Sequence, residues 1–189
     1  MIRSLLVLAA PVALVACGDN LGGPLSYTNP TPCNAMCLIQ SDTPTLQSVT
    51  LSLVVGDQPL TGYSTGFDLP IDVSKVQLGA FTPGSALSPG TSPTAAEATI
   101  VMTGPLAGNL VVAQSQKASG AGAVATDAAL AAHTVLFTFR LDLVSSQNGV
   151  VFDGTVQDFH LPSGGLRSRA GLTVVTPDQV AIGKLEVKR

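Results

Sequence analysis

The chain has 189 residues, of which 46% are hydrophobic and only 11% are charged, and its formal net charge is −3. This length fits one domain with an export segment, and the apolar content is too high for a wholly disordered protein. The 19 glycines and 13 prolines favour short strands and tight turns over long helices. Because no basic stripe is present to neutralise phosphates, we expect no nucleic-acid partner.

The first 16 residues are predicted to form a signal peptide. A short positive start containing Arg3 is followed by an uncharged apolar run from Leu5 to Ala16. A membrane-spanning helix requires roughly 20 residues, so this run is too short to cross a bilayer but has the length of a signal-peptide core. We therefore expect residues 1–16 to be removed on export.

The apolar run ends in Leu14-Val15-Ala16-Cys17, which resembles the lipobox of bacterial lipoproteins. This resemblance implies that the thiol of Cys17 carries a lipid whose acyl chains hold the protein on a membrane. The alternative is an ordinary signal peptide cut after Ala16, with Cys17 left as a free thiol. Residue 18 is glycine, not the aspartate that often retains lipoproteins at the inner membrane. The expected location is therefore the cell envelope, at the outer membrane or the cell surface.

Residues 17–44 are predicted to form a flexible linker, because they are rich in Gly, Pro, Asn, Thr and Ser and show little hydrophobic periodicity. Cys33 and Cys37 lie within this segment, and in an oxidising compartment such a pair most simply forms a disulfide. A redox centre would require Cys-x-x-Cys beside a βαβ unit. A zinc site would require two further ligands, and no histidine lies nearby. A structural disulfide is therefore the favoured interpretation.

Residues 45–189 are predicted to fold as one all-β domain. Three segments alternate apolar and polar residues, which places one side of each strand on a core and the other in water, as in antiparallel sheets. Further short apolar runs are separated by turn signals such as Gly56-Asp57 and Asn148-Gly149. Many short strands at this spacing indicate a sandwich or a barrel. The three alternating segments are 49–55, 67–73 and 135–143.

Two segments depart from the regular strand pattern. The apolar residues of 180–187 change phase along the segment, which predicts a β-bulge at Gly183. The only helical candidate is Thr126–Ala132, where Asp127 would lie in the first turn. We therefore expect at most one short helix in the domain.

One part of the chain carries a recognisable series of motifs. The residues from Gly66 to Leu78 read GFDLPIDVSKVQL and are followed by Phe81-Thr82-Pro83-Gly84-Ser85. This series resembles the cohesin signature. In cohesins, an aromatic-led strand runs into a YDPSVLEV-type turn and then into a strand that ends in Pro-Gly. Segment 118–143 is similar to the Gly-rich loop and FTFKVK-like strand of the family, and segment 180–187 is similar to its closing strand. The resemblance covers Thr45 to Arg189.

This resemblance implies an antiparallel jelly-roll β-sandwich of about nine strands. It also implies a non-catalytic module that attaches to another protein, usually one with a dockerin domain. Because related sandwiches share some of these motifs, the alternative is a carbohydrate-binding module acting on cell-wall or extracellular polysaccharide. The chain has no Trp and only two Tyr, so we expect no flat aromatic platform for sugar rings.

Few residues suggest catalysis. Gly62-Tyr63-Ser64-Thr65-Gly66 matches the G-x-S-x-G pattern of hydrolases, but that pattern needs a helix after the serine, and an alternating segment follows here. Asp158 and His160 would share one side of a strand, yet two ligands do not make a metal site. The remaining histidine is His133. We therefore expect no enzyme activity, no metal and no cofactor.

The sequence thus predicts a lipid-anchored protein with a signal peptide (1–16), a lipidated Cys17 that begins a linker (17–44), and a cohesin-like domain (45–189). The leading hypothesis is protein–protein attachment, in which one side of a sheet buries a few apolar residues inside a polar rim. A purely structural role without a ligand remains an alternative.

Overall fold

The computed structural model describes residues 25–87, 99–104, 108–120, 122–154 and 164–188. Within these ranges the chain consists of fifteen strands, loops and one short 3-10 helix, η2 (Pro177–Gln179). The predicted all-β fold is therefore confirmed. The strands are β1 (Leu25–Thr28), β2 (Met36–Gln40), β3 (Ser48–Val55), β4 (Leu60–Gly62), β5 (Ser64–Pro70), β6 (Val76–Pro83), β7 (Thr99–Gly104), β8 (Asn109–Ser115), β9 (Ala128–Leu130), β10 (Val135–Leu143), β11 (Gly149–Asp153), β12 (Gly164–Arg167), β13 (Thr173–Val175), β14 (Val180–Ala181) and β15 (Lys184–Val187).

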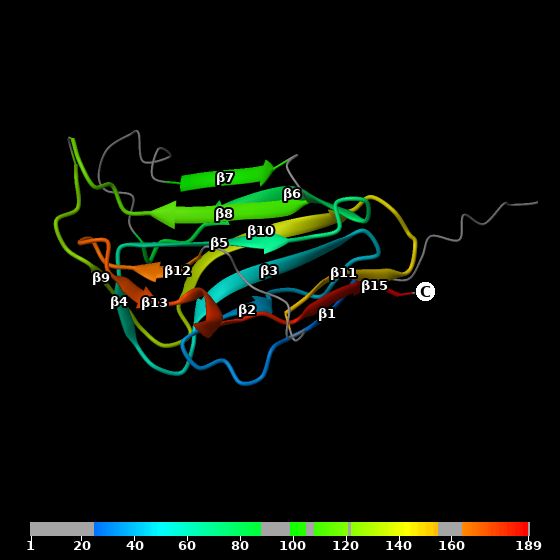
Figure 1. Ribbon diagram of the computed structural model, residues 1–189, viewed down its shortest axis with the longest axis horizontal. Coiled ribbons are helices and arrows are strands. Elements are labelled where there is room, and N and C mark those ends of the chain that lie inside the picture. Colours follow the sequence, from blue (N-terminus) through cyan, green and yellow to red (C-terminus); the bar gives the residue numbers. More distant parts are fainter. Residues whose placement is uncertain (1–24, 88–98, 105–107, 121, 155–163, 189) are drawn as a thin grey trace, which may run out of the picture.

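Two five-stranded sheets form the body of the domain (Figure 1). The first sheet has the strand order β13-β12-β5-β8-β7, and the second sheet has the order β14-β2-β3-β10-β6. A three-stranded sheet (β1-β15-β11) and a two-stranded sheet (β4-β9) complete the arrangement. Paired strands in these sheets run antiparallel, except β14 and β2. The strands outnumber the predicted nine because several consist of only two to four residues.

The core lies between the two large sheets and follows the alternation seen in the sequence. Phe67 on β5 packs against Phe137 and Phe139 on β10, with ring centroids 5.8 and 5.9 Å apart. Leu51 and Leu53 on β3 are fully buried beside them. Burying a large apolar side chain contributes about 1.5–3 kcal/mol. Period-two strands from distant parts of the chain thus bury their apolar sides against one another.

The predicted linker is wrong from residue 25 onward. β1 pairs with β15, and β2 lies between β3 and β14 in the second sheet. Leu25, Met36 and Leu38 are fully buried. These strands are too short to show periodicity in the sequence, and they are stabilised by pairing with strands that follow much later. Cys33 and Cys37 form a disulfide beside β2, with their Cα atoms 5.4 Å apart.

Tyr27 on β1 connects β2 with the break between β14 and β15. Its buried hydroxyl donates a hydrogen bond to the carbonyl of Leu38 (2.8 Å) and accepts one from the backbone N–H of Gly183 (2.9 Å). Burial raises the pKa of Tyr27 well above its ordinary value, although the Gly183 N–H opposes this shift. The phenol therefore stays neutral and satisfies two backbone groups that would otherwise be buried without partners.

The change of phase in 180–187 marks a switch between sheets. β14 pairs with β2 in the second sheet, whereas β15 pairs with β1 and β11. Gly183 lies between the two strands, and a Cβ atom there would come within 1.9 Å of the carbonyl oxygen of Thr28. The predicted bulge at this glycine is therefore a full break between two strands.

The helix predicted for Thr126–Ala132 is absent. Ala128–Leu130 forms β9, which pairs antiparallel with β4. Leu130 is buried in the core, and the strand pairing satisfies the backbone groups that a helix would have bonded internally. Tertiary pairing here overrides the helix propensity of an alanine-rich segment.

Candidate interaction face

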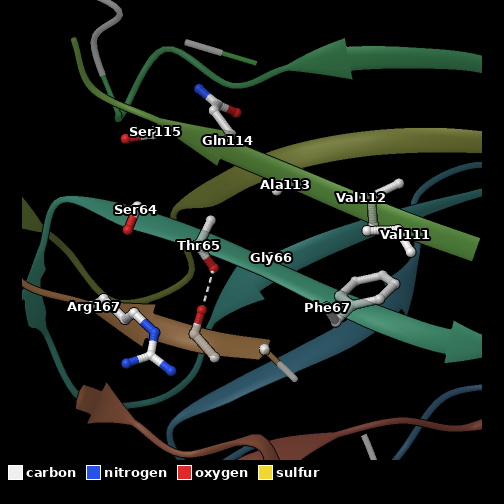
Figure 2. Close-up of a pocket in the computed structure, with 12 residues that line it drawn as sticks. Ser64, Thr65, Gly66, Phe67, Val111, Val112, Ala113, Gln114, Ser115 and Arg167 are labelled. Carbon is white, nitrogen blue, oxygen red and sulfur yellow. Dashed lines mark hydrogen bonds between the residues drawn. The ribbon is translucent and has the colours of Figure 1, made fainter. Parts of the chain in front are cut away.

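The outer side of β12, β5 and β8 is lined by small residues, and we call it the candidate interaction face. Directly opposed pairs on β5 and β8 are Ser64 with Ser115, and Gly66 with Ala113. Figure 2 shows these residues around an open hollow in the sheet surface, with Arg167 at one end. The hollow exists because the side chains on its floor are too short to fill it.

Two glycines form the floor of the hollow. Gly66 on β5 is paired with Gly165 on β12. A Cβ atom at Gly66 would lie 2.6 Å from the carbonyl oxygen of Val112. Gly165 has a φ of +98°, and a Cβ atom there would lie 2.0 Å from the carbonyl oxygen of Val175. Both positions therefore require glycine, and the close strand packing that results keeps the surface low.

Thr65 holds β5 against β12 beneath this surface. It points to the opposite side of β5 from Ser64 and Gly66, and only 4% of it is exposed. Its hydroxyl donates a 2.9 Å hydrogen bond to the carbonyl of Gly165, drawn in Figure 2. The floor of the hollow is thus fixed by a buried side-chain bond as well as by strand pairing.

Arg167 is the cation of the face. It lies opposite Ser64, and its side chain is exposed. Its Nη1 donates long hydrogen bonds to the carbonyl of Gly171 (3.5 Å) and the hydroxyl of Thr173 (3.3 Å). Nε and Nη2 have no partner among the residues that the structure describes. The guanidinium is therefore oriented by its neighbours, and within the described ranges two of its nitrogens keep donors that could bond a ligand.

Asp68 lies two residues further along β5, on the same side as Gly66. Its Oδ1 is buried from solvent and has no hydrogen-bond partner within the described ranges. A buried carboxylate oxygen without a donor is costly. As far as the structure is described, the face therefore carries guanidinium donors at one position and a carboxylate oxygen at another that have no partner.

A loop beside Arg167 is held in place by Arg169 and Tyr63. The backbone N–H of Arg169 donates to Asp127 (2.6 Å), and its Nε donates to the carbonyl of Val124 (3.1 Å). The hydroxyl of Tyr63 donates to the carbonyls of Lys117 (2.6 Å) and Val124 (3.0 Å). The Arg169 guanidinium also lies 5.7 Å from the centre of the Tyr63 ring. These contacts anchor the described parts of the Gly-rich segment that follows β8.

The outer side of the second sheet has a different character. Ser52 on β3 hydrogen bonds Thr138 on β10 at 2.7 Å and also bonds Ser41. Arg140 pairs with Asp142 through two hydrogen bonds of 2.7 and 3.2 Å, and this contact raises the pKa of Arg140. The polar groups of this surface are thus largely bonded to one another.

The G-x-S-x-G match is not a nucleophile elbow. Tyr63 is buried, and Ser64 begins β5, which continues as a strand to Pro70. Ser64 lies between Ser115 and Arg167 on neighbouring strands, so no histidine of the described residues pairs with it there. The serine is part of a sheet surface, as the alternation after it indicated.

The other predicted site residues are dispersed or fall outside the description. His133 lies in the turn after β9 with a φ of 62°, and its N–H bonds the carbonyl of Val55. Asp158, His160 and Cys17 lie outside the described residues. Among the residues that are described, no group of three or more His, Cys, Asp or Glu is placed to hold a metal ion. The same ranges contain no helix long and apolar enough to cross a membrane.

The sequence did not identify Arg167, Ala113 or Gly165 as site residues. The available signals were the glycines at 66, 164 and 165 within strand-like segments, which indicate close approach of backbones. Which strands those glycines bring together depends on the pairing of β12 with β5, whose opposed residues are about 100 positions apart.

No family model matches this chain, and no curated protein matches it. Solved structures do. CaCohA2 in a complex with a CaDoc0917 variant matches with a TM-score of 0.50 and 12% identity, covering 82% of this chain and 99% of that one. The solution structure of CaCohA2 from Clostridium acetobutylicum gives 0.45 and 11%, covering 79% and 92%.

A third solved structure is the third cohesin of ScaC from Acetivibrio cellulolyticus in complex with the ScaB dockerin. It gives a TM-score of 0.47 and 12% identity, covering 82% of this chain and 99% of that chain. At 12% identity, the match to the CaCohA2 complex shows a similarity of fold alone. The described domain therefore has a cohesin-like β-sandwich fold, as its strand pattern and sequence signature predicted.

Proposed function

We propose that this domain is a non-catalytic attachment module that binds a dockerin-type protein ligand through the candidate interaction face. The fold supports the proposal because CaCohA2, which is similar in fold, was solved in complex with CaDoc0917. The observation that carries it is the hollow over Gly66 and Gly165, bordered by Arg167, whose Nε and Nη2 have no partner among the described residues. A flat surface of small side chains with one oriented charged group allows a protein partner to pack closely against it.

The dimensions of the face fit a helix. Adjacent strands lie about 4.8 Å apart, so β12, β5 and β8 together span about 10 Å, which is close to the diameter of an α-helix with its side chains. A helix laid along these strands would bury Ala113 and the glycine floor, and an acidic side chain on it would meet Arg167. The ligand we propose is therefore a helical surface with small contact residues and a carboxylate near one end.

Binding is tested with two matched arginine variants. The mature chain with Cys17→Ser, which removes the acylated thiol, is immobilised and exposed to secreted and envelope fractions with and without calcium. Retained proteins are identified by mass spectrometry, and the dockerin-type module among them is purified for calorimetry. We expect Arg167→Ala to weaken its binding about tenfold, or about 1.4 kcal/mol.

Arg140→Ala is the control, because Arg140 is also an exposed strand arginine but lies on the second sheet and is paired with Asp142. The Arg140→Ala variant should bind the dockerin-type module with the same affinity as the unsubstituted chain. Equal weakening by both variants, or retention of no dockerin-type protein by a folded domain, contradicts the proposal.

We further propose that the chain is held on a membrane of the cell envelope through acylated Cys17. The support is the lipobox-like Leu14-Val15-Ala16-Cys17 after an apolar segment. Mass spectrometry of the mature protein should show an acylated N-terminal cysteine, and Cys17→Ala should release the protein from membranes. A mature protein that begins at an unmodified Cys17 contradicts the anchor without affecting the binding proposal.

The carbohydrate-binding alternative is not favoured by any aromatic surface. Within the described residues, Tyr27, Tyr63, Phe67, Phe137, Phe139 and Phe152 are buried, and Phe81 is half-buried against Phe137. Sugar rings stack on exposed flat rings, and none is exposed in this part of the chain. The described surface therefore favours protein attachment over stacking of sugar rings.

A further inference from the structure

Exposed apolar side chains occur at both ends of the domain, and one end carries four of them. Seven large hydrophobic residues are exposed in the described part of the chain, and four of them lie at the end where β5 turns into β6 and β10 leads to β11 (the right-hand end in Figure 1). We call these four residues the apolar tip. They are Leu46, Val73, Val144 and Val150, with exposed fractions of 62, 54, 53 and 44%.

Backbone hydrogen bonds bring the segments of the apolar tip together. The N–H of Leu143 bonds the carbonyl of Gln47 (2.7 Å), which places the Leu46 loop beside the end of β10. The N–H of Val144 bonds the carbonyl of Lys75 (2.7 Å), next to the turn that contains Val73. The N–H of Asp72 bonds the carbonyl of Val151 (3.0 Å), next to Val150. The four side chains thus come from four segments that meet at one end of the sandwich.

The described chain also begins at this end. Leu25 pairs with Val187 on β15, and Val187 pairs in turn with Gly149, the neighbour of Val150. Cys17 lies only eight residues before Leu25. Eight residues span at most roughly 27 Å even when fully extended. A lipid carried by Cys17 therefore keeps this end of the domain close to the bilayer, because β1 already begins at Leu25, within the segment predicted as a linker.

We propose that the apolar tip rests on the lipid bilayer to which Cys17 is anchored. The inference depends on the proposed lipid anchor. The tip places its four side chains at the boundary between headgroups and acyl chains, where apolar surface leaves water. Charged side chains near this end are partly neutralised within the protein, because Lys75 is paired with Asp72, and Glu186 is paired with both Lys184 and Lys188.

This placement orients the candidate interaction face. β5 runs from Ser64 towards the tip. The strands of the candidate interaction face are therefore steeply inclined to the membrane plane, and the hollow opens parallel to the membrane. Arg167, paired with Ser64 at the start of β5, lies at the end away from the bilayer. A ligand can then approach along the membrane plane without contacting lipid.

Tryptophan fluorescence provides the test, because the chain has no tryptophan of its own. Val144→Trp places a single indole on the tip, and Leu172→Trp places one at the opposite end, on a residue that is 69% exposed. Each full-length variant is acylated in cells, purified and reconstituted into phosphatidylcholine vesicles with or without brominated acyl chains. We expect bromine to quench Val144→Trp at least about twofold more strongly than Leu172→Trp.

The outcomes separate this inference from the anchor on which it depends. Equal quenching of the two variants in protein that is acylated and vesicle-bound overturns the apolar tip as a membrane contact but leaves the anchor intact. A blue shift of Val144→Trp that depends on protein density, without bromine quenching, also overturns it and indicates a second copy of the chain as the occupant. Absence of acylation removes the anchor and the inference together.

Discussion

The two large sheets bury the same core between them, but the polar groups on their outer sides are satisfied in different ways. On the second sheet, Ser52 bonds Thr138 and Arg140 pairs with Asp142. On the candidate interaction face, glycine, alanine and serine form the surface, and Arg167 keeps donors without partners in the described part of the chain. The two arrangements therefore leave different groups available to a ligand.

This difference indicates which surface gains from being covered. When a partner covers a surface whose polar groups already bond one another, those groups lose water and gain few new bonds. When a partner covers small residues beside an oriented guanidinium, it gains close packing and a charged hydrogen bond. The contrast between the two sides is therefore the physical basis for assigning ligand binding to the first sheet.

The largest expected effect comes from filling the hollow. Ala113→Leu should weaken binding of the dockerin-type ligand about 100-fold, because the larger side chain occupies the space above the glycine floor. Ala80→Leu is the matched control, since Ala80 is exposed on β6 and lies opposite Arg140 on the second sheet. Calorimetry with both folded variants measures the comparison. Comparable losses from both would remove the distinction between the two sides.

The next largest effect is on the free energy of unfolding, and it is expected from the second sheet, not from the candidate interaction face. Thr138→Val removes the 2.7 Å hydrogen bond to the nearly buried Ser52 and should lower the free energy of unfolding by about 1 kcal/mol. Ser64→Ala on the candidate interaction face should change it by less than about 0.5 kcal/mol. Urea unfolding of both variants provides the values. A larger loss for Ser64→Ala would mean that the first sheet, not the second, depends on its surface polar groups.

A local effect is expected beside the face. Arg169→Ala removes the guanidinium contacts to the carbonyl of Val124 and to the Tyr63 ring. Amide hydrogen exchange should become several-fold faster in the segment between β8 and β9, with little change in global stability. Uniformly faster exchange throughout both sheets would show that Arg169 supports the whole fold and not this loop.

The smallest effect concerns the turn that carries the chain from the first sheet to the second. Hydrogen bonds from Lys75 and Ser74 hold the pKa of Asp72 below its ordinary value of 3.8. Stability from this carboxylate is therefore fully present above pH 3.8 and is lost as the pH falls through the lower pKa of the folded state. In Asp72→Asn, the thermal unfolding temperature should therefore fall less steeply as the pH is lowered below 3.8. An unchanged fall would show that other carboxylates cause it.

Patterns that repeat locally were predictable. The alternation in 49–55, 67–73 and 135–143 predicted strands that the structure contains as β3, β5 and β10, and most of the predicted apolar residues lie in the core. Val73, which lies beyond the end of β5, and Val135 are exposed instead. The change of phase before Gly183 correctly located an irregularity. Short segments were not predictable: β1 and β2 have four and five residues and were interpreted as linker. Their stability comes from partners that the local sequence does not contain.

By itself, the sequence determined the all-β class, the apolar side of each long strand, and the cohesin-like character of the signature from Gly66 to Ser85, because these depend on residues close together in the chain. Only the tertiary structure decided that β1 and β2 belong to the sheets, that Ala128–Leu130 is a strand, and that Gly66, Ala113, Gly165 and Arg167 share one surface. The physical reason is strand pairing. Hydrogen bonds between β5 and β12 join residues about 100 positions apart, and no local periodicity encodes which edges will meet.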